Sequence, residues 1–544
     1  MRWKALRHGF PLVVVGILIL PTILSAQKSL SHVRVVRLSY VSGTVGVKRP
    51  ASTEWAKGQV NTPIQEGFEL STAANSYAEV EFENGSTARL GEFSKVNFDQ
   101  LAMDQDGNKL NRLTFEQGYA TFHFLPEHQD AYSVKIAEAT LTPNGKSEFR
   151  ADLDRGRLRV EVFSGSVELA AASQTVKLGK DKVLEFDPQA TQVALNAKPG
   201  IVKDSWDKWT SDRDTQTQLS LADQAVGARG PLYGWSDLNA YGEWGYFPGF
   251  GYGWSPFASA GWSPYGMGMW SWYPGMGYAW ISGEPWGWLP YHYGNWNFSS
   301  GFGWFWMPGS MGNWSPAMVS WYSGPGWVGW APLGAMGAAG QSIVTTVPGG
   351  AIQNGQMIEP TNVNHMPVTA GSPIKGMPFQ PGVGAMLSGP RLSANAEALF
   401  TPHEGALHST APSSILAGGD AEKEQSLHGW HLTHQPLRAR LGTTLGGHYS
   451  VGGTVGEFRG NAFSGGRGTG GPNGVKGPQG PGFSRSAGTS APVILSHGQQ
   501  SSASSPGVGG ATMSSGGGNY GSNAPATMST ASSGHSASAG SGHH

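Results

Sequence analysis

The sequence contains no cysteine among its 544 residues. This absence excludes disulfides, thiolate metal sites, cysteine nucleophiles and a lipidated cysteine anchor. Charge is also scarce, because only 13% of the residues are charged, about half the usual share in globular domains. The formal net charge is −1, so no global field draws in nucleic acid or an anionic membrane. The chain must therefore gain its stability from sheet pairing and apolar burial.

Long apolar runs are equally rare, and the one candidate lies near the N-terminus. A basic segment with Arg2, Lys4 and Arg7 precedes an apolar run of about 13 residues, short of the roughly 20 that span a bilayer. Leu24-Ser25-Ala26 then supplies a small-residue cleavage site. We therefore expect a signal peptide over residues 1–26 and export to the periplasm or cell envelope. If the segment stays uncleaved, it would anchor the chain in the inner membrane, and this is the alternative.

Residues 33–190 have the pattern of an all-β domain. Between residues 78 and 83, apolar side chains alternate with three glutamates, which predicts one packed face and one face in water. Turn signals recur about every 10 to 20 residues, as expected of short strands. They occur at Asn84-Gly85, Asp106-Gly107, Pro143-Asn144-Gly145 and Ser164-Gly165.

Residues 201–222 predict a helical connector. Val202, Trp206 and Trp209 fall at i, i+4 and i+7, opposite a side rich in Asp, Ser, Gln and Arg. We expect this helix to lay its two tryptophans on a neighbouring domain.

Residues 235–334 hold 16 of the 21 tryptophans and repeat with a period of 26 residues. A partial fourth copy covers residues 321–332. Each copy predicts a small β-hairpin with a glycine-rich turn, closed by Trp-x-Pro. So small a unit buries little surface alone, so we expect the copies to stack tryptophan on tryptophan. The in-phase positions include Trp244/Trp270/Trp296, Trp254/Trp280/Trp306 and Trp262/Trp288/Trp314.

The pattern dissolves beyond the repeat. Residues 335–439 predict a Gly/Pro-rich segment of low order, and residues 440–544 are mostly small and polar. Such a tail cannot offset the entropy of ordering, so we expect it to be disordered. The predicted fold class is therefore mainly β: a β domain, a short helical connector, tandem aromatic hairpins and a disordered tail.

The strand region resembles the FecR domain, and the repeat resembles a tryptophan-rich domain of unknown function often found after it in exported proteins. The residues that carry the first resemblance are Gly43–Val45, Gly67–Thr72, Ala78–Phe82, Asn84–Ser86, Leu141–Gly145 and Val162–Glu168. Those that carry the second are Glu284–Trp296 and Val328–Pro332.

The resemblance implies a FecR-like β fold and points to a regulatory role. In the best-known family members, the FecR domain lies in the periplasm and relays an iron-transport signal to a cytoplasmic sigma factor. That role requires a cytoplasmic segment and a transmembrane helix. Only Met1–Phe10 precede the apolar run, so we expect the fold to carry over and the sigma-regulating activity to be absent.

No set of residues predicts catalysis or a metal site. His403-Glu404 and His408 echo a zinc protease, but the histidines are five positions apart instead of four. Asp104, Asp106 and Asn108 suggest a calcium loop, but its required glycine would fall at Lys109 and its bidentate acid at Phe115, so a hairpin turn explains them better. We expect no enzyme, no resident metal and no cofactor. Weak adventitious metal affinity is the most we expect of His428, His431 and His434.

The aromatic repeat is the main functional candidate. No Lys or Arg occurs between Arg229 and Lys375, so the cationic groove that single-stranded nucleic acid requires is missing. We expect most tryptophans to form the stacked core of the repeat. Tryptophan faces also stack on uncharged sugar rings, so the partner expected for tyrosines and tryptophans left on its rim is a neutral glycan or an envelope protein. The residues first expected on a binding rim are Glu284, Trp286, Trp288, Tyr291, His292 and Tyr293.

Two hypotheses of function follow. The first is a non-catalytic structural or binding protein of the cell envelope, with the FecR-like domain as scaffold. The alternative is a membrane-anchored FecR-type sensor or regulator of envelope signalling. A hydrolase of wall polysaccharide is disfavoured, because no carboxylate recurs with the period of 26.

Overall fold

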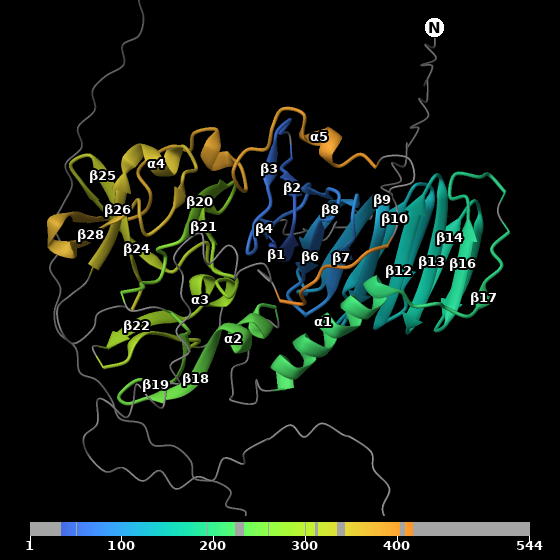
Figure 1. The fold of residues 1–544 in the computed structure, drawn as a ribbon, viewed down its shortest axis with the longest axis horizontal. Helices are drawn as coiled ribbons and strands as arrows, with labels where there is room; N and C mark the ends of the chain where they lie inside the picture. The colour runs from blue at the N-terminus through green and yellow to red at the C-terminus, as the bar shows by residue number, and fades with distance from the viewer. Residues whose placement is uncertain are drawn as a thin grey trace, which may run out of the picture. The chain divides into compact units, whose positions relative to one another are not determined.

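A computed structural model describes residues 34–50, 52–192, 194–222, 233–258, 261–299, 301–309, 314–334, 343–402 and 409–416 (Figure 1). All of them belong to the first of two compact units, Met1–Val451. The expected signal peptide and the tail at 440–544 lie outside these residues. The described part is mainly β, which confirms the predicted fold class.

Residues 36–199 form seventeen strands in two sheets that share one long strand, β9 (Figure 1). From edge to edge, the first sheet contains β4 (Pro63–Ile64), β1 (Val36–Ser42), β6 (Tyr77–Glu81), β7 (Thr87–Leu90), β9 (Lys109–Phe124), β12 (Ser147–Asp154), β13 (Arg157–Ser164), β16 (Lys182–Phe186) and β17 (Lys198–Pro199). The second contains β3 (Trp55–Lys57), β2 (Val45–Lys48), β5 (Glu69–Thr72), β8 (Lys95–Met103), β9, β10 (Ala131–Ile136), β11 (Ala139–Pro143), β14 (Ser166–Ala171) and β15 (Gln174–Gly179).

The facing sides of the two sheets form one apolar core. Val80 of β6 and Phe122 of β9 enter it from the first sheet, and Leu70 of β5 and Val96 of β8 enter it from the second. All four side chains are fully buried. Because strand residues alternate between faces, the alternation in the sequence selects which side of each strand meets the core.

The predicted turns occur where the sequence places them. Gly85, Gly107, Gly145 and Gly165 all adopt positive φ. In the second turn, one oxygen of Asp104 accepts hydrogen bonds of 2.9 Å from the backbone N–H groups of residues 106 and 108. The carboxylate that resembles a calcium ligand is therefore used to stabilise the turn.

Strand β9 passes from the second sheet to the first at Gly118. Residues up to Gln117 pair with β8, and those from Gly118 onward pair with β12. Gly118 has a φ of +88°, in the left-handed region that favours glycine. A Cβ atom there would lie 2.4 Å from the Ser94 hydroxyl oxygen and 2.6 Å from Ser94 Cα. The junction of the two sheets therefore requires glycine.

Helix α1 (Ser205–Ala222) lies across the outer face of the first sheet (Figure 1). Trp206 packs against Tyr77 and Tyr119, with ring centroids 6.1 and 5.2 Å apart. Trp209 packs against Tyr40 at 5.2 Å. The helix therefore lays two tryptophans on the β domain, as the sequence predicts.

Two expectations for this region are wrong. Val202 precedes the helix and is 83% exposed, so it does not share the tryptophan face. The glutamate face of β6, expected in water, is buried: Glu79 is 2% and Glu81 is 4% exposed. The physical reason is that α1 and residues 233–237 cover this face and bring charged side chains of their own, among them Arg213 and Asp237.

Four β-hairpins follow, and they coincide with the repeat copies. They pair β18 (Gly242–Phe247) with β19 (Gly251–Pro256), β20 (Gly268–Tyr273) with β21 (Gly277–Ser282), β22 (Asn295–Ser299) with β23 (Gly303–Met307), and β24 (Val319–Gly324) with β25 (Trp327–Pro332). We call residues 233–334 the aromatic module. Its two short helices are α2 (Trp235–Tyr241) and α3 (Trp288–His292).

The hairpins associate in alternation, not in sequence order. The first joins the third through the pairing of Trp254 with Trp306. The second packs on the fourth, where Trp270 lies 4.4 Å from Trp321 and 5.4 Å from Trp330 between ring centroids. The expected stacking of tryptophan on tryptophan therefore occurs between copies that are two units apart.

The segment expected to have low order, 335–439, is ordered over 343–402 and 409–416, so that expectation is wrong there. Three of its strands extend hairpin edges, because β26 pairs with β25, β29 with β24, and β27 with β20. This pairing satisfies backbone groups that a lone hairpin leaves open. Its elements are β26 (Ile343–Pro348), α4 (Gly349–Gln353), β27 (Met357–Ile358), β28 (Asn364–Pro367), η1 (Val368–Ala370), β29 (Ser372–Ile374), η2 (Gly384–Met386) and α5 (Ala396–Leu399).

We expect Gly118→Ala to lower the free energy of unfolding by more than about 2 kcal/mol, because left-handed strain and steric overlap add. Gly107→Ala is the matched control, since its φ is +85° and nothing lies within 4 Å of the added Cβ. The control should cost only the backbone strain, about 1 kcal/mol. Urea unfolding of the full chain measures both, and equal shifts in the two variants would contradict the steric argument.

Candidate functional site

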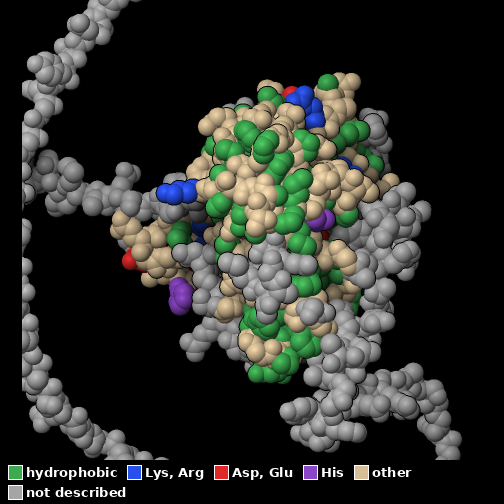
Figure 2. Space-filling model, turned by 90° about the vertical axis from the view of Figure 1, so that its left-hand side faces the viewer, with side chains coloured by type: hydrophobic (Ala, Val, Ile, Leu, Met, Phe, Trp, Pro, Cys, Tyr) green, Lys and Arg blue, Asp and Glu red, His purple; other side chains and the backbone are tan. Residues whose placement is uncertain are grey.

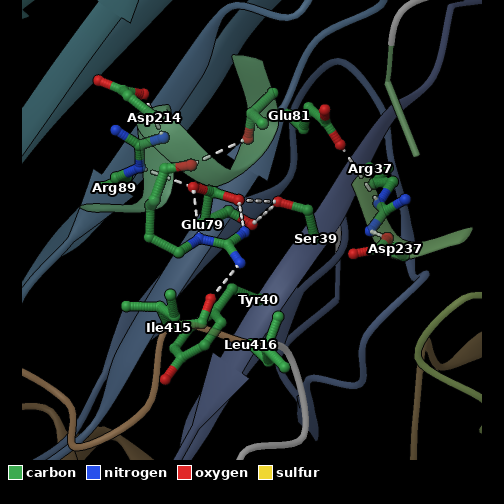
Figure 3. A network of polar contacts seen from close by, with 12 residues as sticks. Arg37, Ser39, Tyr40, Glu79, Glu81, Arg89, Asp214, Asp237, Ile415 and Leu416 are labelled. Atoms are coloured by element: carbon green, nitrogen blue, oxygen red, sulfur yellow. Dashed lines mark hydrogen bonds and ion pairs between the residues drawn. The ribbon is translucent and has the colours of Figure 1, made fainter. Parts of the chain in front are cut away.

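The outer face of the first sheet carries a buried network of charges (Figure 3). Strand β1 contributes Arg37 and Ser39, β6 contributes Glu79 and Glu81, and β7 contributes Arg89. All five are at most 4% exposed. Burial of unpaired charge costs several kcal/mol per ion, so the pairing of each group decides what this face can do.

Glu79 is the centre of the network. Its carboxylate accepts hydrogen bonds from Arg89 Nε at 2.6 Å, from the Ser39 hydroxyl at 2.7 Å, and from Arg213 of α1. Burial alone would raise the pKa of Glu79, but Arg213 and Arg89 hold that pKa well below its usual range. The carboxylate is therefore charged, and two arginines from different elements are fixed to it.

The network extends outward through both arginines. Arg89 also pairs with Asp214 of α1 at 2.7 Å, and His123 Nδ1 lies 3.1 Å from the same Asp214 oxygen. Arg213 donates a second hydrogen bond to the Ile415 carbonyl at 2.6 Å. The sheet, helix α1 and the segment at 409–416 are thereby held by one set of charge-assisted bonds.

Arg37 links the β domain to the aromatic module. It pairs with Asp237 of α2, and its Nε lies 3.6 Å from a Glu81 oxygen that accepts a hydrogen bond from the Gly234 backbone N–H at 3.1 Å. One guanidinium thus serves two buried carboxylates. Burial raises the pKa of Glu81 to about 7 and also raises the pKa of Asp237, although Arg37 opposes both shifts.

This interface has the character of a structural joint. Its charged groups are paired with one another, and because they are buried, a substrate cannot reach them. Within the described residues there is no cluster of three or more His, Cys, Asp or Glu placed to hold a metal ion. His403, His408 and the histidines at 428–434 lie outside these residues.

The residues first expected on a binding rim lie in the core of the aromatic module. Glu284, Trp286, Trp288, Tyr291, His292 and Tyr293 are all at most 4% exposed. The rim expectation is wrong for them, because the hairpins close over the segment from Glu284 to Tyr293 from both sides. Tyr291, for example, packs against Tyr265, Trp280, Trp286 and Trp296.

Two of these buried residues titrate abnormally. Glu284 accepts hydrogen bonds from the Ser282 hydroxyl and, at 3.3 Å, from Trp262 Nε1, and burial raises its pKa to about 7. His292 Nδ1 lies 2.7 Å from the Ser315 carbonyl, and burial lowers its pKa to about 4. His292 is therefore neutral at pH 7, while Glu284 keeps its proton to a higher pH than an exposed glutamate does.

The hairpins present a second set of aromatic pairs that sequence reasoning missed. Each of the first three hairpins has an inner rung, the paired tryptophans of the repeat, and an outer rung two residues nearer the turn on the same face. The outer rungs are Tyr246–Tyr252, Trp272–Tyr278 and Phe298–Trp304. The signal was present in the sequence, because these positions also recur every 26 residues with aromatic side chains.

The outer rungs are accessible. Tyr246 and Tyr252 are 59% and 56% exposed, and the other four side chains are half-buried. Figure 2 views this end of the molecule, where hydrophobic side chains gather and charged ones are few. The arrangement can stack on a flat uncharged partner.

One outer rung borders a hollow of about 360 Å³ between the second and fourth hairpins and residues 376–381. Its aromatic lining consists of Trp272, Tyr278, Trp321 and Phe379. No charged side chain lines it among the described residues. This size falls at the lower end of the range for small-molecule pockets, roughly 300 to 1,000 Å³.

We expect Glu79→Gln to lower the free energy of unfolding by about 3 kcal/mol or more, because the buried Arg213 loses its paired carboxylate and the buried Arg89 loses one of its two. Glu185→Gln is the matched control, since Glu185 pairs with Arg157 at 2.8 Å but both side chains are about half exposed. That variant should change stability by less than about 1 kcal/mol. Equal shifts in denaturation midpoint for the two variants would contradict the role given to the network.

The raised pKa of Glu284 predicts a pH dependence of stability. Because its folded pKa, about 7, exceeds the ordinary 4.5, the folded state holds the proton more tightly than the unfolded state. Its contribution is therefore complete below pH 4.5 and is lost as the pH rises to 7. Relative to Glu284→Gln, which imitates the protonated acid, the wild type should lose on the order of 3 kcal/mol between these pH values.

Denaturation midpoints of both proteins at several pH values measure this difference. His292 has the opposite slope, because its folded pKa is lowered and its stabilising effect grows as the pH rises from about 4 to 6.5. It is present in both proteins, so it cancels in the comparison. A difference that does not change with pH would overturn the assignment to Glu284.

Comparison with known proteins gives two family matches. Residues 68–168 match the FecR protein family, and residues 235–337 match DUF6600, a family of unknown function. A search of curated proteins found no match.

Among solved structures, two crystal structures of a candidate anti-sigma factor from Parabacteroides distasonis, at 1.65 and 2.50 Å resolution, resemble part of the chain. Their sequence identities are 14% and 12%, and both have a TM-score of 0.21. The similarity covers 27% and 28% of this chain, and 64% and 73% of the solved chains. By its family matches, the chain carries a FecR domain followed by a domain of the DUF6600 family.

Proposed function

We propose that this protein is a non-catalytic binding protein of the cell envelope. In this proposal the FecR domain is a scaffold, and the outer rungs of the aromatic module dock a neutral glycan or an envelope protein. The observation that carries it is the set of three exposed or half-exposed aromatic pairs on a module without Lys or Arg.

The scaffold role is supported by the occupied outer face of the first sheet. Glu79, Glu81 and Arg89 are paired with residues of α1, α2 and their neighbours. A partner that used this face would have to displace α1 together with the two buried tryptophans, Trp206 and Trp209. The aromatic module is therefore the more accessible surface for recognition.

A FecR-type sensor or regulator of envelope signalling is the second candidate, and the match of residues 68–168 to the FecR family favours it. The same match supports an envelope-associated protein in either case. Among the described residues no helix is long and apolar enough to cross a membrane. The apolar segment ending near Leu24 lies outside them, so mass spectrometry of the mature N-terminus decides. A chain that retains this segment supports the regulator, and one that starts at Gln27 argues against it.

We expect the purified full chain to co-sediment with isolated cell envelopes, and the bound fraction to change little between about 50 and 200 mM salt. Salt screens charge–charge contacts and leaves stacking largely intact. The double variant Tyr246→Ser/Tyr252→Ser should bind about tenfold more weakly, because two exposed rings are lost.

Val202→Ser is the matched control, since it also removes an exposed apolar side chain, 83% exposed, but one outside the module. It should sediment like the wild type. Release by salt, or equal binding by the wild type and the double variant, would refute the proposal.

A further inference from the structure

The hollow beside the second outer rung has the features of a small ligand site. Trp272 and Tyr278 lie directly opposite each other on β20 and β21, and Trp321 of β24 and Phe379 complete the aromatic lining. All four rings are half-buried, so each has a face or edge that is open.

Residues outside the hollow hold its walls in place. The ring of Trp321 packs on the buried Trp270 at 4.4 Å. The Trp272 carbonyl accepts a hydrogen bond from Arg49 of the β domain, and Arg49 also stacks over the Tyr273 ring at 4.1 Å. Strand β20 is therefore fixed to the FecR domain, and the site is formed before a ligand arrives, which lowers the entropic cost of binding.

The polar groups at the hollow argue against a purely apolar ligand. The Tyr278 hydroxyl is buried, and it has no hydrogen-bond partner among the described residues. Because this hydroxyl oxygen is inaccessible, only the ring of Tyr278 can meet a ligand in the hollow. Gln380, also in the lining, is exposed and can donate and accept hydrogen bonds.

From these features we infer that the hollow binds one or two neutral sugar rings. A pyranose offers an apolar C–H face for the aromatic rings and hydroxyls for Gln380. A phosphate or carboxylate ligand would find no cation in the lining. A proline-rich peptide needs an extended aromatic groove, whereas this hollow is short. The inference rests on the proposed function and names the ligand class at one of its outer rungs.

The test titrates the full chain with two neutral disaccharides, N,N′-diacetylchitobiose and cellobiose, by calorimetry and tryptophan fluorescence. At least one of them should bind. Trp272→Ala should weaken that binding by tenfold or more, because a stacking face is lost. Gln380→Ala removes the exposed polar side chain at the hollow and should weaken it about fivefold, the value of one hydrogen bond. This second variant keeps all four aromatic rings and changes an exposed side chain, so it guards against an effect that is merely one of folding.

The Val202→Ser variant should bind the disaccharide like the wild type, because the exposed side chain that it removes lies outside the aromatic module. The inference is overturned if neither sugar binds, if a folded Trp272→Ala binds normally, or if decaproline binds in place of the sugars. If the wild type binds neither sugar but still sediments with cell envelopes, this inference is refuted and the proposed function is not. If the wild type neither binds a sugar nor sediments with envelopes, the inference and the proposed function are both refuted.

Discussion

The fold depends on how a buried row of glutamates is neutralised. Glu79 and Glu81 alternate with core residues along β6, so they must emerge on the outer face of the first sheet. Once that face is covered, each carboxylate needs a cation or a proton. Arg89 and Arg213 supply the charge to Glu79, whereas Glu81 shares Arg37 with Asp237. Because these buried carboxylates require partners, the contacts that compensate them also hold helix α1 and the aromatic module against the β domain.

The aromatic module divides one repeat between two tasks. Inner-rung tryptophans such as Trp254, Trp280 and Trp306 are fully buried and build the core. Outer-rung residues lie one pleat closer to the turn and meet solvent. The division follows from strand geometry, because residues two apart share a face but differ in distance from the centre of the module. A single repeat can thus provide both stability and a surface for recognition.

The connection through Arg37 bears on both candidate functions. A rigid joint between the FecR domain and α2 would present the outer rungs in a fixed orientation, which suits a scaffold. In a regulator, the same joint would transmit a change in the position of one module to the other. Two carboxylates share one guanidinium there, and burial raises the pKa of Glu81 to about 7, so we expect this contact to respond to pH near neutrality. The Arg213 contact differs, because two arginines keep Glu79 charged.

The sequence alone determined what local signals encode. The alternation of apolar and polar residues determined which side of β6 faces the core. Glycines such as Gly85 and Gly165 determined where turns occur, and the period of 26 residues located four hairpins. These features depend on residues close together in the chain. Tertiary structure decided the features that depend on residues far apart in the chain. Arg213 lies 134 positions from the Glu79 that it neutralises, and residues 343–402 order by pairing with hairpin edges. Because burial is a property of the assembled surfaces, the polar tips from Glu284 to Tyr293 indicated a rim, whereas packing placed them in the core.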